Sequence, residues 1–293
     1  MTAGRRPLDG RRAVVTGAAD GLGRAFALAL ADAGAAVAVC DVLPGADDVA
    51  REVESRGVSG YGQVADLRDA DAIHAFVENA ATHLGGIDLL VNNAAAYLQT
   101  FPATDGWRRA IDDFHFVADV NYRGAYLVGR AAIPHIVKQG GDIVNITTDH
   151  IHTCGYPEAV DHADAPQCRW AATRRPPVGG PRFDVYDSSK WAVKGLTHVW
   201  AAALAEHGVR VNSFGMGATD TPMIRRHLEG KGAPAPRNLM RPEQVAAILV
   251  ELVLEGSGGR TGDSVEVWLD HPCVLPPVSL DGALAAGALA ASR

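Results

Sequence analysis

Residues 13–23 read Ala-Val-Val-Thr-Gly-Ala-Ala-Asp-Gly-Leu-Gly, an apolar run followed by three closely spaced glycines. The run has the composition of a buried strand, and the apolar residues after it recur at helical spacing. Gly17, Gly21 and Gly23 fall in the turn between the two elements, where missing Cβ atoms let the backbone approach a pyrophosphate at the helix N-terminus. Because the spacing is G-x-x-x-G-x-G and not G-x-G-x-x-G, a simple helix-capping turn is the alternative interpretation.

The alternation of short apolar runs with longer helical patterns continues along the chain. It predicts strands at 13–15, 37–40, 61–64, 89–91, 143–146, 209–214 and 265–268, and helices at 22–34, 47–56, 69–84, 105–138 and 241–255. This order favours an α/β fold, a Rossmann-type doubly wound parallel sheet of about seven strands with helices on both faces. Ligands of such sheets bind at the carboxyl ends of the strands, where the strand order reverses.

The chain has 293 residues, of which 47% are hydrophobic and 21% charged, a balance typical of globular proteins. Two domains of about 150 residues would fit, but α/β folds of about 250 residues often form one. We expect a single domain over residues 8–275 and an alanine-rich C-terminal tail over residues 276–293.

Composition also restricts the partners. The net charge of -7 and the lack of a basic cluster argue against nucleic acid as a ligand. No long apolar stretch is free of charges, which argues against a membrane span. The four scattered cysteines favour a reducing cytoplasm over a disulfide scaffold.

Acidic residues near the glycine turn predict the cofactor. Asp41 closes the second predicted strand, where a carboxylate accepts hydrogen bonds from an adenosine ribose and repels a 2′-phosphate. Asp20 adds negative charge to the turn, so the sequence predicts NAD in preference to NADP. Asp66 and Leu67 follow the third strand and are candidates to hold the adenine edge. The alternative for Asp41 is that it only begins a loop.

Further motifs follow the later strands. Asn92-Asn93-Ala94-Ala95 follows the fourth strand, and Tyr186 precedes Lys190 by four positions. Together with the glycine turn, over roughly residues 8–270, this pattern resembles the short-chain dehydrogenase/reductase family. The resemblance implies an NAD-dependent oxidoreductase that transfers hydride between a secondary alcohol or ketone and the nicotinamide, and it implies a homodimer or homotetramer. The implied cofactor-binding residues are Gly17, Asp20, Gly21, Leu22, Gly23, Asp41, Asp66, Leu67, Asn93, Tyr186, Lys190, Gly217, Thr219 and Thr221.

The implied catalytic residues are Asn121, Thr148, Tyr186 and Lys190. A helix places Tyr186 and Lys190 on one face. A phenol with a pKa near 10 needs about 4 kcal/mol of differential stabilisation to act as a base at neutral pH, which an ammonium and the nicotinamide charge are expected to supply. Thr148 would hydrogen-bond the substrate oxygen, and Asn121 would support a water chain to Lys190.

The chain departs from the family pattern in places. Ala95 replaces a glycine, Thr148 replaces the usual serine, and Met216-Gly217 replaces a Pro-Gly pair. Threonine keeps the hydroxyl donor but adds a methyl group. Met216 and His150 are the candidates to contact the substrate.

A long segment separates Thr148 from Tyr186. Tyr186 lies 38 positions after Thr148, which exceeds the family spacing by about 25, and loops of such length are often lids or binding loops. We therefore expect residues 152–182 to cover the substrate pocket. His150, His152, Cys154, His162 and Cys168 are possible zinc ligands, but their spacing matches no common zinc module, so we expect no metal.

Two alternatives remain at this point. A non-catalytic NAD-binding sensor or scaffold would explain the altered serine position, but such a protein has no need of an ionisable phenol. An enoyl reductase or a sugar epimerase is the other alternative. The Tyr-to-Lys spacing opposes the first, and the short C-terminal part opposes the second.

Overall fold

The computed structural model describes residues 5–151, 183–229, 239–267, 273–279, 282–285 and 287. Its strands are β1 (Arg12–Thr16), β2 (Ala36–Asp41), β3 (Gly60–Val64), β4 (Leu89–Asn92), β5 (Gly141–Ile146), β6 (Val209–Met216) and β7 (Ser264–Val267). They form one parallel sheet in the order β3-β2-β1-β4-β5-β6-β7. The order reverses between β1 and β4, as a doubly wound sheet requires. The predicted fold class is confirmed.

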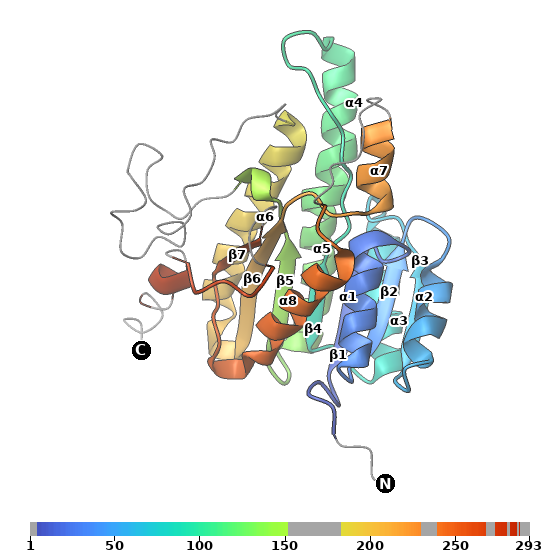
Figure 1. The fold of residues 1–293 in the computed structure, drawn as a ribbon, viewed down its shortest axis with the longest axis vertical. Helices are drawn as coiled ribbons and strands as arrows, with labels where there is room; N and C mark the ends of the chain where they lie inside the picture. The colour runs from blue at the N-terminus through green and yellow to red at the C-terminus, as the bar shows by residue number, and fades with distance from the viewer. Residues whose placement is uncertain are drawn as a thin grey trace.

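Helices cover both faces of the sheet (Figure 1). On one face, α1 (Gly21–Asp32), α2 (Ala46–Glu54) and α8 (Pro242–Leu254) share an apolar core with the strands. On the other face, α3 (Ala70–Leu84), α5 (Ala125–Ile136) and α6 (Asp184–Ala203) build a second core. Because both faces are buried, the central strands consist of nearly continuous apolar residues, which is why short apolar runs located them.

The predicted helix over 105–138 is a continuous rod in three parts. It consists of α4 (Trp107–Ala118), a π-helical turn η1 (Asp119–Gly124) and α5. In Figure 1 its α4 end extends beyond the sheet, and within α4 only Val117 is buried. The wide π turn contains Asn121, whose side chain bonds to a neighbouring loop, as is frequent for such turns at functional sites.

Two features differ from the sequence expectation. Strand β6 extends to Met216, two residues further than predicted, because Met216 pairs with Val267 of β7. Helix α7 (Pro222–Glu229) was not predicted, since its eight residues are fewer than apolar periodicity needs to identify a helix.

The remaining described helices are short 3-10 segments: η2 (Asp149–Ile151), η4 (Ala205–His207) and η5 (Gly256–Gly258). In the C-terminal tail, residues 282–285 are helical. Across the described ranges, no helix combines the length and apolar character that crossing a membrane requires.

Candidate active site

A cavity of about 520 Å³ opens at the carboxyl ends of the strands, on both sides of the point where the strand order reverses. It runs from the glycine turn to the helix that carries Tyr186. The predicted residues that line it are Gly17, Asp20, Gly21, Leu22, Gly23, Asp41, Asp66, Leu67, Asn93, Thr148, His150, Tyr186, Lys190, Met216, Gly217, Thr219 and Thr221. Of the residues expected to act in the site, Asn121 is the one outside this lining.

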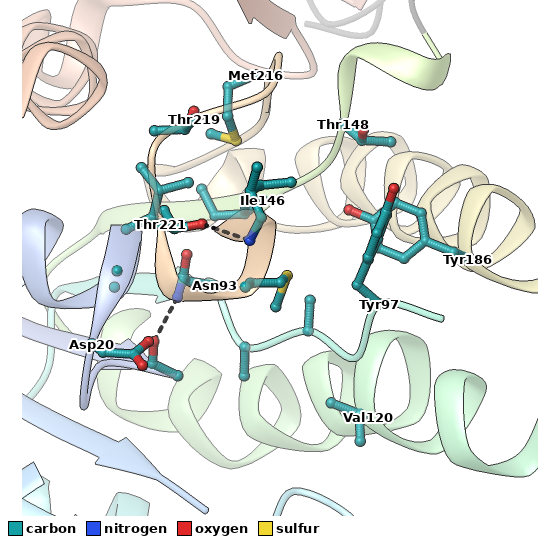
Figure 2. A pocket seen from close by; sticks show the side chains of 18 of the residues that line it. Asp20, Asn93, Tyr97, Val120, Ile146, Thr148, Tyr186, Met216, Thr219 and Thr221 are labelled. Carbon is teal, nitrogen blue, oxygen red and sulfur yellow. Dashed lines mark hydrogen bonds between the residues drawn. The ribbon is translucent and has the colours of Figure 1, made fainter. Parts of the chain in front are cut away.

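The glycine turn depends on missing side chains. Gly17 has φ 65°, a left-handed conformation that favours glycine. A Cβ atom on Gly23 would lie 2.0 Å from the carbonyl oxygen of Gly17, so no other residue fits there. Asn93, labelled in Figure 2, donates from its amide to the carbonyl oxygens of Thr16 and Gly17 at 2.9 Å each. The turn is therefore held open at the N-terminus of α1, where free N–H groups favour an anion.

Asp41 closes β2 and ties two segments of the cavity wall together. Its Oδ2 accepts from the backbone N–H of Ala19 in the glycine turn, and its Oδ1 accepts from that of Leu43, both at 2.9 Å. Each carboxylate oxygen has a second acceptor position. Asp41 therefore shapes the turn and also lines the cavity, and its contact with a cofactor ribose stays a prediction.

The other expected cofactor contacts have partners of their own. Asp66 forms an ion pair of 2.6 Å with Arg68, whose hydrogen bonds lower the pKa of the Asp66 carboxyl. On the opposite wall, the Thr219 hydroxyl donates to the carbonyl of Gly217 at 2.9 Å. The Thr221 hydroxyl accepts from the N–H of Ile224 in α7. These bonds fix the two threonines in the wall of the cavity.

Tyr186 and Lys190 lie one helical turn apart on α6, and both are buried. The Nζ atom of Lys190 donates to the backbone carbonyl of Ile146 at the end of β5, at 2.9 Å. It lies 5.7 Å from the centroid of the Tyr186 ring. Burial lowers the pKa of Lys190 to about 8, since desolvation disfavours the charged amine.

The surroundings of Tyr186 in the protein alone favour the protonated phenol. Burial raises the pKa of its phenol above the ordinary value, and the nearby Tyr97 phenol raises it further. A hydrogen-bonding interaction with Thr148 acts in the opposite direction, and the carboxylates of Asp149 and Asp187 again raise the pKa. With its pKa raised, Tyr186 is a proton donor at neutral pH in the protein alone, and stabilisation of the phenolate by Lys190 and a bound nicotinamide stays a prediction.

His150 lies beside the two hydroxyls. Its Nδ1 shares a hydrogen bond of 2.8 Å with Asp187, the residue after Tyr186, and its ring stacks on Phe183 at 5.6 Å between centroids. Its backbone N–H donates to the Thr148 hydroxyl at 3.4 Å. The Asp187 carboxylate and the Phe183 ring thus help to orient the imidazole in the cavity wall.

Asn121 acts behind the cavity wall. Its Oδ1 accepts from the N–H of Ala96 at 2.6 Å, and its Nδ2 donates to the Ala96 carbonyl and to the Ser189 hydroxyl at 3.0 Å each. Ser189 in turn donates to the Tyr186 carbonyl. Asn121 therefore joins the loop after β4 to α6, and the expected water chain to Lys190 stays a prediction.

Sequence reasoning missed several residues of the site. Tyr97, Val120, Met223 and His227 also line the cavity, and the first two are labelled in Figure 2. Tyr97 follows the Asn92-Asn93 motif closely, which was the one local signal available. The others come from elements whose approach depends on the tertiary fold.

The predicted lid, residues 152–182, lies outside the described residues, and so do His152, Cys154, His162 and Cys168. Its place over the pocket stays a prediction. Within the part of the chain that the structure describes, no three His, Cys, Asp or Glu side chains form a possible metal site.

Known proteins are similar to this chain in sequence and in fold. The family model described as short chain dehydrogenase matches residues 11–156, and that described as Enoyl-(Acyl carrier protein) reductase matches residues 175–267. The chain is 32% identical to cis-4-hydroxycyclohexanecarboxylate dehydrogenase of Sinomonas cyclohexanicum, over 86% of this chain and 92% of the relative. It is 28% identical to the 3-oxoacyl-[acyl-carrier-protein] reductase of Thermotoga maritima, over 89% and 97%.

A solved short-chain type dehydrogenase/reductase from Mycobacterium marinum superposes with a TM-score of 0.70 at 28% identity, covering 90% of this chain and 95% of that one. The matches extend through both the glycine turn and the Tyr186 helix. The chain is therefore an oxidoreductase of the short-chain dehydrogenase/reductase family, which uses a nicotinamide cofactor.

Proposed function

We propose that this chain is an NAD-dependent enzyme that interconverts a secondary alcohol and a ketone, with Tyr186 as the general acid and base. The observation that carries the proposal is the burial of Tyr186 and Lys190 in the same cavity as the glycine turn. Burial of the amine destabilises its charged form, and the pKa of Lys190 therefore falls to about 8. A protein that only binds a dinucleotide has no need of a destabilised, buried lysine next to a tyrosine.

The cavity fits a dinucleotide. The glycine turn would hold the pyrophosphate, Asp41 the adenosine ribose, and Lys190 the nicotinamide ribose. The bound nicotinamide would supply the hydride acceptor or donor. In ketone reduction Tyr186 donates its proton to the substrate oxygen, and in alcohol oxidation it takes the proton from the hydroxyl. The Thr148 hydroxyl orients the same oxygen.

The protein favours one protonation state before any ligand binds. Since burial raises the pKa of Tyr186, the phenol is set to act as an acid. Oxidation requires the phenolate, which the positive charges of the nicotinamide ring and of Lys190 would stabilise.

NAD is the proposed cofactor because the cavity carries negative charge where the two cofactors differ. Asp41 and Asp20 both line that end. A ribose hydroxyl can donate to the free acceptor positions of Asp41, whereas a 2′-phosphate would meet repulsion.

The two relatives named above suggest the first substrates to test. Their names describe the oxidation of a ring alcohol and the reduction of a 3-oxoacyl group, and both reacting carbons pass between secondary alcohol and ketone. We propose a small molecule of this class as the substrate and the cytoplasm as the location. A homodimer or homotetramer is consistent with the exposed aromatic residues Trp107, Phe114 and Phe116 on α4.

The test is a screen of secondary alcohols and ketones with NAD, NADH, NADP and NADPH, followed at the absorbance of the reduced nicotinamide. The panel includes cyclohexanol, cis-4-hydroxycyclohexanecarboxylate, a 3-oxoacyl thioester and an enoyl thioester. Turnover of an alcohol or ketone with NAD or NADH supports the proposal. Tight NAD binding without turnover of any compound would favour a sensor or scaffold, and turnover of the enoyl thioester alone would favour an enoyl reductase.

A further inference from the structure

A second phenol lies beside Tyr186, and the proton transfer assigned above does not use it. Tyr97 is on the loop after β4, and its ring centroid is 4.8 Å from that of Tyr186. The rings stand at 83°, the edge-to-face geometry that aromatic pairs favour. In Figure 2 the two hydroxyl ends point toward the side of the cavity where Thr148 lies.

Other rings hold Tyr97 in this orientation. The Phe183 ring lies 4.7 Å from it between centroids, and the His227 ring of α7 lies 5.0 Å from it at 79°. With neighbours on several sides, the phenol has little freedom to turn away. A side chain locked by packing is what a precise contact with a ligand requires.

The Tyr97 hydroxyl is available to a ligand. The groups that influence it are its buried surroundings and the carboxylates of Asp187 and Asp149, and it hydrogen-bonds no residue in the ranges that the structure describes. Tyr97 nevertheless lines the cavity. A half-buried hydroxyl that has no partner among the described residues and faces a cavity is favourable only if another group, such as water or a ligand, completes its hydrogen bonds.

We propose that Tyr97 donates a hydrogen bond to the reacting oxygen of the substrate, beside Thr148 and Tyr186. This inference rests on the proposed function, since it assigns a further group to the same reaction. In ketone reduction, hydride addition from a reduced nicotinamide places negative charge on the carbonyl oxygen. Tyr186 transfers its proton to that oxygen, and Tyr97 stabilises the charge without losing its own proton.

The surroundings separate the roles of the two phenols. Burial and the carboxylates of Asp187 and Asp149 raise the pKa of the Tyr97 phenol. The Lys190 ammonium, which would counteract this, lies over the ring of Tyr186. Because the pKa of both phenols is raised, both are protonated donors at neutral pH, and the position of Lys190 near the Tyr186 ring is what assigns the proton transfer to Tyr186.

Two substitutions distinguish donation from packing. Tyr97→Phe keeps the ring contacts and removes the hydroxyl, whereas Tyr97→His loses ring volume and keeps an N–H donor. The probe is the ketone with the highest kcat/KM in the screen. We expect Tyr97→Phe to lower kcat/KM about 10- to 100-fold with NADH affinity unchanged within twofold, and Tyr97→His to retain more activity than Tyr97→Phe. Tyr61→Phe, which removes a phenol hydroxyl outside the cavity, is the matched control.

The outcomes separate this inference from the proposed function. Activity of Tyr97→Phe within twofold of the parent would overturn it, as would higher activity in Tyr97→Phe than in Tyr97→His. Loss of NADH binding together with activity would assign Tyr97 to packing and also overturn it. If instead Tyr186→Phe keeps full activity, the proposed mechanism fails, whatever the Tyr97 variants do.

Discussion

The amine of Lys190 lies 5.7 Å from the centroid of the Tyr186 ring and donates its hydrogen bond to the Ile146 carbonyl. The end of β5 therefore holds the lysine so that its charge lies near the Tyr186 ring. Because that charge is buried, it lowers the free energy of unfolding of the protein.

Lys190→Met should abolish turnover and stabilise the fold. Burial lowers the pKa of Lys190 from 10.5 to about 8, so the amine binds a proton more weakly in the folded state than in the unfolded chain. The resulting destabilisation is about 3 kcal/mol below pH 8 and disappears as the pH rises from about 8 to 10.5. After the lost hydrogen bond is subtracted, we expect a gain of about 1–3 kcal/mol at pH 6 in urea unfolding and less at pH 9.5. Lys138→Met, at an exposed lysine, is the control, and a less stable Lys190→Met protein would contradict the argument.

Tyr186→Phe should remove nearly all turnover and leave NAD affinity within a few-fold. The substitution takes away the proton donor, while the glycine turn and Asp41 keep their contacts. Steady-state kinetics and a fluorescence titration with NADH measure the two effects. Substantial residual turnover would mean that another group handles the proton.

Alcohol oxidation should accelerate with rising pH, and ketone reduction should not. Burial raises the pKa of Tyr186, so the phenolate that oxidation needs is scarce at neutral pH and becomes more abundant as the pH rises. Reduction uses the protonated phenol, which is already present. Profiles of kcat/KM from pH 6 to 10 in both directions provide the measurement. Oxidation that is faster at pH 6 than at pH 9 would refute the assignment.

Thr148→Ser should be tolerated, whereas Thr148→Ala should not. Serine retains the hydroxyl and loses one methyl group, so we expect kcat/KM within about fivefold. Alanine removes a donor to the reacting oxygen, and a loss of about 100-fold is expected. Thr82→Ala, on the exposed surface of α3, controls for the loss of a threonine. Equal activity of the serine and alanine variants would exclude a role for the hydroxyl.

Asp41→Ala should weaken the preference for NAD over NADP by at least about tenfold. The change removes a ribose acceptor and the charge that repels a 2′-phosphate. Because Asp41 also accepts from the N–H of Ala19, some loss of NAD affinity is expected too. The ratio of kcat/KM for the two cofactors is the readout, with Asp71→Ala as a control of equal charge. An NADP preference in the parent protein would show that Asp41 has been misinterpreted.

The sequence alone predicted the features that depend on residues close together along the chain. The apolar runs of the buried strands, the glycines of the first turn and the four-residue separation of Tyr186 and Lys190 each follow from local geometry. The parallel sheet then brings the strand ends together, so residues after β1, β2, β4, β5 and β6 line one cavity. That is why residues of widely separated motifs line the same cavity.

Only the tertiary structure decided how the chemical groups influence one another. The contact of Tyr97 with Tyr186 joins positions on different elements, and no periodicity encodes it. The bond between His150 and Asp187 depends on the approach of α6 to the end of β5. The raised pKa of Tyr186 is a further case, because desolvation depends on everything packed around the phenol, whereas the sequence shows only the lysine four residues away.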